Sequence, residues 1–202
     1  MRLFRLFLPI LVGGAFAACG SSTTEPEPRP PADLNIIKLP ADHPPFEKTT
    51  VSFWANKSES REGKIYFLDS QGHRGEEYAR LRIDSGSLLA RPDGTPFGAR
   101  DSVLITMSVA DPSQILVDLQ PSGLRFAPDK PAELKLTYGA TGGDLNEDGR
   151  IDEKDGDIEQ KMAIWRQEKV GDLFVQIGVV KVDELREIEA KLTSFSRYAI
   201  AY

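Results

Sequence analysis

Short apolar runs separated by turn-forming residues fill most of the chain, and this pattern constrains the fold more than any other feature. Within residues 102–110 and 132–138 apolar side chains recur at every second position, which places them on one face of an extended strand. Turn-forming pairs such as Asp-Gly at 93–94 and Asp-Pro at 111–112 lie between the runs. The sequence therefore predicts an all-β, antiparallel β-sandwich over residues 46–202.

The expected strands account for most of this region, and helical periodicity is confined to two short pieces at residues 157–161 and 183–187. The hydrophobic content of 40% is that of an ordinary globular protein, so one packed core is expected. The strands expected from the pattern are residues 50–55, 64–69, 77–83, 102–110, 114–119, 132–138, 162–167, 173–181, 188–192 and 197–202.

Residues 144–155, DLNEDGRIDEKD, are the one stretch whose spacing implies specific chemistry. Calcium prefers oxygen ligands from a loop that presents them at alternate positions, with a glycine at the sharp bend. Gly149 stands at the bend position, and Ile151 is expected to pin the loop to a core. The spacing therefore predicts a site for one Ca²⁺. The predicted ligands are the side chains of Asp144, Asn146, Asp148, Asp152 and Asp155 and the backbone carbonyl of Arg150.

These twelve residues resemble the calcium loop of dockerins, which closes on Asp where most EF-hands close on Glu. A dockerin carries two such loops with helices, whereas here a single loop follows a predicted strand. The resemblance therefore implies one ion-binding hairpin and not a complete dockerin. The alternative is an acidic, solvated turn, because Asp, Asn and Gly are also the residues that turns favour.

The negative charge of the chain is concentrated around this loop. The formal net charge is −6, and residues 144–157 hold seven acidic side chains against two basic ones. This distribution favours a cation as the partner and argues against nucleic acid.

Residues 1–18 have the three-part form of a secretory signal: two arginines, an apolar run and small residues before Cys19. Cys19 is the only cysteine, so no disulfide within the chain is possible. The end of this segment, FAAC, resembles the lipobox of bacterial lipoproteins, with Phe16 where Leu is usual. The resemblance implies that Cys19 is acylated and anchors the protein in a membrane. Gly20, in place of Asp, implies the outer membrane of a Gram-negative bacterium.

Residues 19–45 are rich in proline and poor in large apolar side chains, which predicts a disordered, extended tether. Within it, residues 34–39 have enough apolar character to add an edge strand. The predicted organisation is a signal peptide (1–18), a lipidated linker (19–45) and a β-sandwich domain (46–202) that contains the calcium-type loop.

Three segments of the predicted sandwich carry a second resemblance: residues 87–109, 117–138 and 189–202. In the middle segment Gly123 permits a tight bend, after which Leu124 and Phe126 return to the core. The three segments are similar to successive motifs of the ZU-five domain, a β-sandwich found in zonula occludens proteins, netrin receptors and ankyrins. The resemblance implies a protein-interaction role and no particular activity.

Catalytic chemistry is not expected. Histidine occurs only at positions 43 and 73, and lipidation of Cys19 leaves no thiol. A zinc site, or a nucleophile activated by a histidine base, is therefore difficult to assemble.

Two further features are expected to be structural. Some ZU-five modules cut themselves between Phe and Ser of a His-Phe-Ser motif, but here Phe195 and Ser196 follow Ser194, which cannot replace the histidine base. Phe195 is thus expected in the core, with Ser196 at the start of the last strand. Trp54 and Trp165 are expected in the core or at its rim, with a sugar-binding surface as the alternative.

These features predict a non-catalytic, lipid-anchored protein of the cell envelope, in which calcium stabilises a sandwich that serves as a structural or protein-interaction module. A carbohydrate-binding or adhesive module is the first alternative, and it predicts exposed aromatic side chains beside the loop. A self-cleaving module at Phe195–Ser196 is the second alternative. The expected partners are the membrane, through the lipid on Cys19, and a protein or a glycan.

Overall fold

The computed structural model describes residues 27–202, so the predicted signal peptide and the predicted lipidation site at Cys19 lie outside the described residues. The helical elements are η1 Pro31–Asp33, η2 Gly139–Thr141, α1 Glu153–Lys161 and η3 Asp183–Leu185. The strands are β1 Thr50–Asn56, β2 Arg61–Leu68, β3 Arg74–Ile83, β4 Leu88–Ala90, β5 Ser102–Val109, β6 Leu116–Gln120, β7 Arg125–Phe126, β8 Ala132–Thr137, β9 Ala163–Gln167, β10 Phe174–Gln176, β11 Val179–Val182, β12 Glu187–Leu192 and β13 Arg197–Ala201.

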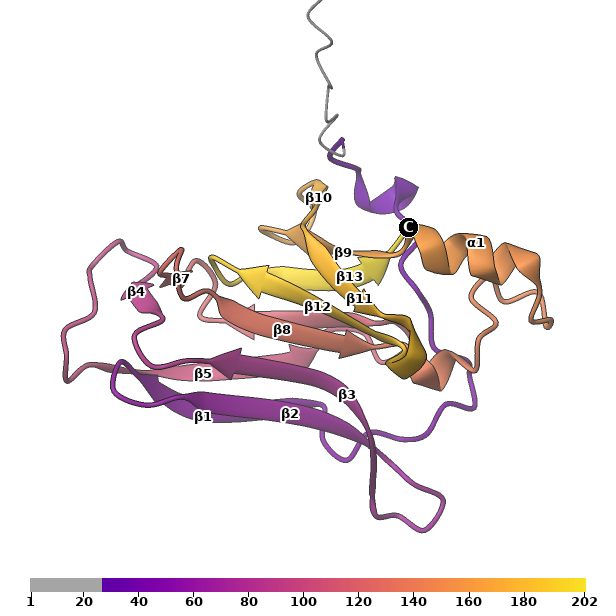
Figure 1. The fold of residues 1–202 in the computed structure, drawn as a ribbon, viewed down its shortest axis with the longest axis horizontal. Helices are drawn as coiled ribbons and strands as arrows, with labels where there is room; N and C mark the ends of the chain where they lie inside the picture. Colours follow the sequence, from indigo (N-terminus) through magenta and orange to yellow (C-terminus); the bar gives the residue numbers. More distant parts are fainter. Residues whose placement is uncertain (1–26) are drawn as a thin grey trace, which may run out of the picture.

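Two antiparallel sheets form the body of the molecule (Figure 1). One has six strands in the order β1-β5-β6-β13-β9-β10, and the other has five in the order β11-β12-β8-β3-β2. Ile105 and Leu119 of the first sheet and Leu81, Leu134 and Ile188 of the second are fully buried in one core. The all-β, antiparallel prediction is confirmed, because the alternating apolar residues of both sheets meet between them.

The strand predictions agree with the structure except at residues 173–181. Gly178 divides this run into β10, at the edge of the six-stranded sheet, and β11, at the edge of the five-stranded sheet. The chain therefore crosses from one sheet to the other where one continuous strand was expected. The short strands β4 and β7 were not expected, and they pair with each other at the end of the sandwich away from α1 (Figure 1).

The bend expected at Gly123 is present. Gly123 has a φ of 80°, in the region that glycine adopts at little cost, and the side chains of Leu124 and Phe126 are buried after it. The ring of Phe126 lies 4.8 Å from that of Phe195, which is itself fully buried. As expected, Phe195 belongs to the core, and the last strand, β13, begins two residues after it.

Residues 29–39, named here the strap, join the sandwich although the sequence places them in the tether. The Ile37 N–H donates to the Ile200 carbonyl at 2.9 Å, and the Ile115 N–H donates to the Ile37 carbonyl at 2.9 Å. Leu34, Ile37 and Leu39 are buried. The packed part of the chain therefore begins well before the boundary expected at residue 46, because the apolar residues of 34–39 find a place beside β13.

The strap covers a second, smaller core on the outer face of the six-stranded sheet. Leu34 packs there with Trp165 and Phe174, and the Arg29 guanidinium lies 5.0 Å from the centre of the Trp165 ring. Arg29 and Phe174 also exchange two backbone hydrogen bonds of 2.8 Å, which extends the sheet beyond β10. Between residues 27 and 202, no helix is long and apolar enough to cross a membrane.

Candidate metal-binding site

The predicted calcium loop lies between β8 and β9 at one end of the sandwich. It follows η2 and leads directly into α1, which projects beyond the sheets (Figure 1). The expected helical piece at 157–161 is thus part of a longer helix that begins at Glu153.

The first half of the loop gathers three predicted ligands. The Asp144 carboxylate accepts hydrogen bonds from the N–H groups of Asp148 at 3.2 Å and Gly149 at 2.9 Å. The Asn146 side-chain oxygen also accepts from the Asp148 N–H, at 2.9 Å, and its amide nitrogen lies 3.3 Å from the Asp148 carboxylate. The Asp148 carboxylate in turn accepts from the Arg150 N–H at 3.0 Å. Gly149 has a φ of 81°, so the bend stands where the spacing predicts it.

Asp155 closes the loop from the helix side. One carboxylate oxygen accepts hydrogen bonds from the N–H groups of Leu145 at 2.7 Å and Asn146 at 3.3 Å, and the other accepts from the Asp152 N–H at 2.8 Å. The hydrogen bond from the Asp152 N–H, followed by those from Leu145 and Asn146, lowers the pKa of the Asp155 carboxyl. Asp155 is only 4% exposed, so its charge is satisfied by the backbone of both halves of the loop.

Asp152 caps the helix that follows. Its carboxylate accepts from the Lys154 N–H at 2.9 Å, and together with Asp155 it forms a capping box at the N-terminus of α1. At the other end of α1, the Lys181 ammonium donates to the carbonyls of Glu159 at 2.6 Å and Gln160 at 2.9 Å. A cation at the C-terminal carbonyls complements the helix dipole, so both ends of α1 are held.

Leu145 and Ile158 hold the loop to the body of the protein. Both side chains are 8% exposed and belong to the main core, one from each side of the loop. The expectation that Ile151 would pin the loop is wrong, because this side chain is 72% exposed. Ile151 instead lines a pocket beside the loop together with Leu145 and Tyr138.

The loop also contacts the strap. The Lys38 ammonium lies 2.6 Å from the Glu147 carboxylate, and this pairing raises the pKa of Lys38. Glu147 has a φ of 60°, a left-handed conformation that is uncommon for residues other than glycine. Asn35 and Tyr202 line a groove together with Glu147, so the strap, the C-terminus and the loop meet at this point.

The predicted ligand atoms are oxygens, the kind that a hard cation prefers, but the side chains that carry them are hydrogen-bonded to the backbone of the loop. Across residues 27–202, no three His, Cys, Asp or Glu side chains are arranged so that they could hold a metal ion. The carboxylates of Asp144, Asp148 and Asp155 accept backbone N–H groups instead. Asp144, Asn146, Asp148 and the Arg150 carbonyl offer only oxygen atoms as ligands, as calcium requires.

Phe195 and Ser196, the two residues at the cleavage point of the self-cleavage alternative, are buried. Ser196 is 3% exposed, and the preceding Ser194 hydroxyl accepts a hydrogen bond from Arg166 at 3.2 Å. His43 packs against the rings of Phe46 and Phe67. The other histidine of the chain, at position 73, stands in the exposed turn before β3.

The two tryptophans have different environments. Trp165 is buried, and its indole N–H donates to the Ala201 carbonyl at 3.1 Å. Trp54 is 61% exposed on β1, which differs from the expectation of a core or rim position. It lies two residues before the end of β1, where Lys57 contacts the Phe97 carbonyl and the Phe97 N–H bonds to Leu89 of β4. The end of the sandwich that holds β4 and β7 is the one away from α1 (Figure 1). The exposed tryptophan that a loop-flanking sugar site would need is therefore at the other end of the sandwich.

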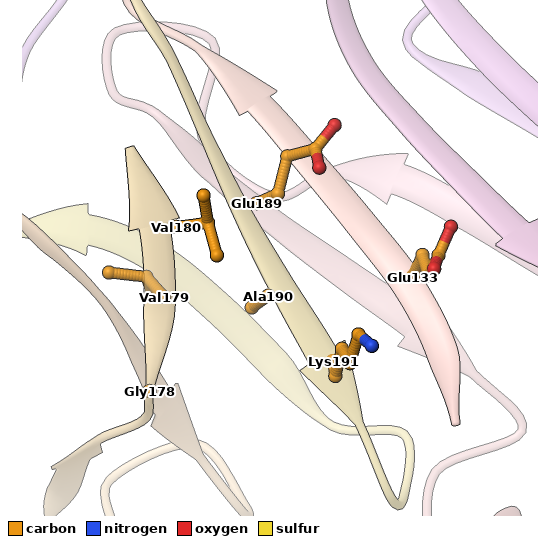
Figure 2. Close-up of a pocket in the computed structure, with 7 residues that line it drawn as sticks. All are labelled: Glu133, Gly178, Val179, Val180, Glu189, Ala190 and Lys191. Carbon is orange, nitrogen blue, oxygen red and sulfur yellow. The ribbon is translucent and has the colours of Figure 1, made fainter. Parts of the chain in front are cut away.

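A shallow apolar groove runs along the edge of the five-stranded sheet between β11 and β12. Figure 2 shows Val179, Val180 and Ala190 along it, with the charged groups of Glu133, Glu189 and Lys191 around them. Val180 is 65% exposed. The groove is therefore an apolar surface bordered by charged side chains.

No family model, curated protein or solved structure matches this chain.

Proposed function

We propose that the protein is a non-catalytic, lipid-anchored module of the cell envelope whose β-sandwich is stabilised by one calcium ion in the loop 144–155. The observation that carries this proposal is the position of the loop, which joins three parts of the molecule. Leu145 lies in the main core, Asp155 joins the loop to α1, and Glu147 pairs with Lys38 of the strap. An ion that orders this loop would therefore order the end of the sandwich.

The local charge supports a cation as the ligand. Seven acidic side chains stand between residues 144 and 157, and only Arg150 and Lys154 oppose them within that stretch. Lys154 lies 3.6 Å from the Asp148 carboxylate but is mostly exposed, so its charge is largely screened. A bound divalent cation would reduce the repulsion among these carboxylates and so stabilise the folded state.

The strap supports the role of the chain as an anchored module. Because residues 29–39 are seated on the sandwich, only about nine residues would separate an acylated Cys19 from the folded body. Nine residues span at most about 30 Å, at ~3.3 Å for each residue. The proposed lipid would therefore hold the sandwich close to the membrane, where it serves as a structural or interaction module.

Isothermal titration calorimetry with CaCl₂ tests the metal site. We expect a dissociation constant of about 0.1–1 mM, the range of extracellular calcium modules. Asp148→Asn should weaken binding at least tenfold, because it removes a charged ligand. Asp157→Asn is the matched control: it makes the same change in charge on the exposed side of α1 and should bind as the wild type does. The absence of both heat and thermal shift at several millimolar calcium would refute the metal site.

Lipidation is tested separately. Membrane fractionation of cells that express the wild type should place the protein with the outer membrane, and Cys19→Ser should release it or leave it unprocessed. Mass spectrometry of the N-terminal peptide should show fatty acyl groups on Cys19. An unmodified cysteine in the mature protein would exclude the anchor without affecting the calcium site.

A further inference from the structure

The outer face of β1 and β5 carries no charged side chain. The cross-strand pairs Thr50–Ser108, Ser52–Thr106, Trp54–Leu104 and Asn56–Ser102 put these eight residues on one surface, named here the neutral face. The inward positions between them are apolar and pack against the core, for example Ile105 and Met107. Charged residues make up 28% of the chain, so the lack of charge at eight neighbouring outward positions, four on each strand, requires an explanation.

The outer face of the other sheet is the opposite in character. The outward residues of β2, β3, β8 and β12 form two rows of four charges each, Glu62-Arg82-Glu133-Lys191 and Lys64-Arg80-Lys135-Glu189. The charges on this face form ion pairs. The Lys135 ammonium, for example, lies 2.8 Å from the Glu77 carboxylate and 2.7 Å from the Glu187 carboxylate. Hydration and ion pairs explain why the charged side chains of that face are exposed. They do not explain why an indole is exposed on the neutral face.

Two apolar side chains stand at the centre of the neutral face. Trp54 is 61% exposed and Leu104, directly across from it, is 45% exposed. Around them lie hydroxyl groups, of which Ser52 and Thr106 bond to each other at 2.8 Å. Exposing an indole to water is unfavourable, and Trp combines a flat apolar ring with a polar N–H that still needs a partner when covered.

We propose that the neutral face binds an uncharged polysaccharide with an extended backbone. A pyranose ring has an apolar C–H face, which matches the indole of Trp54, and a rim of hydroxyls, which matches the serine and threonine hydroxyls beside it. The absence of charge on the protein suits a ligand without charge, since an acidic polymer would gain no ion pair here. Strand β1 is about 20 Å long at ~3.3 Å for each residue, enough for several sugar units in a row.

A second copy of the chain fits this face less well. Stable dimers bury about 1,200–2,000 Å² in total and have an apolar centre. The neutral face offers only Trp54 and Leu104 as large apolar groups, with hydroxyls on all sides. Self-association through it would therefore be weak.

Affinity electrophoresis of the purified full-length protein tests the proposal. Native gels would contain laminarin, xyloglucan, galactomannan or dextran as neutral polymers, and polygalacturonate as the acidic one. We expect retardation in at least one neutral polymer and none in polygalacturonate. Trp54→Ala should raise the dissociation constant at least tenfold, and Leu104→Ser should raise it less. The matched control is Val180→Ala, an exposed apolar residue on the other sheet, which should bind as the wild type does.

Thermal unfolding of each variant shows whether it is folded, and light scattering shows whether it self-associates. Retardation should persist with chelator, because the neutral face contains no residue of the loop 144–155; failure of the calcium site would leave this result unchanged. No retardation in any neutral polymer, or retardation that Trp54→Ala leaves intact, would refute the proposal. A dimer that dissociates in Trp54→Ala would also refute it, since a second copy would then cover the face.

Discussion

The carboxylate of Asp155 joins the two halves of the loop, so a change at this one residue should loosen both. Asp155→Asn replaces an oxygen that accepts N–H groups with an amide nitrogen that cannot accept them. We expect a lower melting temperature and faster amide exchange in the first turn of α1. Asp157→Asn, an exposed change on the same helix, should leave both unchanged.

The effect of Asp155 should depend on pH with a defined sign. Backbone N–H donors lower the pKa of Asp155 below its ordinary value of 3.8, so the folded state holds the charged form more strongly than the unfolded state does. Its stabilising contribution is then complete above pH 3.8 and is lost as the pH falls through the lower, folded-state pKa. The difference in melting temperature between wild type and Asp155→Asn should be constant near neutral pH and shrink below about pH 4. A difference that persists unchanged to pH 2 would contradict this account.

Phe195 should matter for stability and not for cleavage. Its ring is fully buried against Phe126, so Phe195→Ala should cost about 3–5 kcal/mol of unfolding free energy. Trp54→Ala, at an exposed aromatic, should change it by no more than about 0.5 kcal/mol. Urea denaturation measures both. A wild-type preparation that contains a C-terminal fragment beginning at Ser196 would instead support self-cleavage.

At residue scale, the spacing of the loop predicted where the acidic groups stand but not what each one touches. Asp152 and Asp155 were expected as ligands, and in the structure they form the capping box of α1. The capping box and the calcium loop require the same spacing. Each places two acidic residues three positions apart, as the N-cap and N3 residues of a helix or as positions nine and twelve of a calcium loop. The exposure of Ile151 was not predictable from the loop alone, because burial at that position depends on a second loop.

The strap and the loop should respond to calcium as one element. Asn146 and Asp148 are proposed ligands on either side of Glu147, and Glu147 contacts the strap through Lys38. Calcium should therefore increase the amide-exchange protection of Ile37, whose N–H bonds to the Ile200 carbonyl. Lys38→Met should reduce this increase without abolishing calcium binding measured by calorimetry.

Lys154→Met is the matched control for the strap experiment. This substitution also removes one positive charge beside the loop, since the Lys154 ammonium lies near Asp148. Among the interactions of residues 27–202, Lys154 makes no contact with the strap. Its calcium-dependent protection of Ile37 should equal that of the wild type. An equal calcium-dependent protection of Ile37 in Lys38→Met and in the wild type would show that the Lys38–Glu147 pair does not couple the strap to the loop.

At element scale, the alternation of apolar residues found the long strands and missed features that depend on contacts far apart in the sequence. The run 173–181 is mostly apolar, with Gln176 and Lys181 as its polar residues, so only the crossing at Gly178 reveals that its halves belong to different sheets. The strands β4 and β7 span three and two residues, too few for a period to be visible. The strap was assigned to the tether because proline dominates its surroundings, yet residues 34–39 carry enough apolar surface to dock.

The two faces of the whole molecule differ in charge and define separate roles. The outer face of the five-stranded sheet is covered by ion pairs, and one half of the other outer face is covered by the strap. Strands β1 and β5, at one edge of the six-stranded sheet, form the neutral face proposed to bind glycan, and the Asp118–Arg197 ion pair of β6 and β13 lies beside it. The proposed calcium loop lies at the opposite end from Trp54, so the role proposed for the loop is in stability and the role proposed for the neutral face is in recognition.

Calcium and acid should therefore act on the stability of the whole sandwich in opposite directions. For a site with a dissociation constant of about 0.1–1 mM, 10 mM calcium stabilises the folded state by about 1.4–2.7 kcal/mol. In a domain of this size that raises the melting temperature by about 3–10 °C. The increase should become smaller as the solution is acidified, because protons compete with calcium for carboxylate ligands. Scanning calorimetry with and without calcium at pH 7 and in acid measures it, with Asp148→Asn as the variant that should show a clearly smaller increase at pH 7. An increase that is as large in acid as at pH 7, or that Asp148→Asn leaves undiminished, would place the ion elsewhere on the molecule, because both changes weaken the carboxylate ligands of the loop.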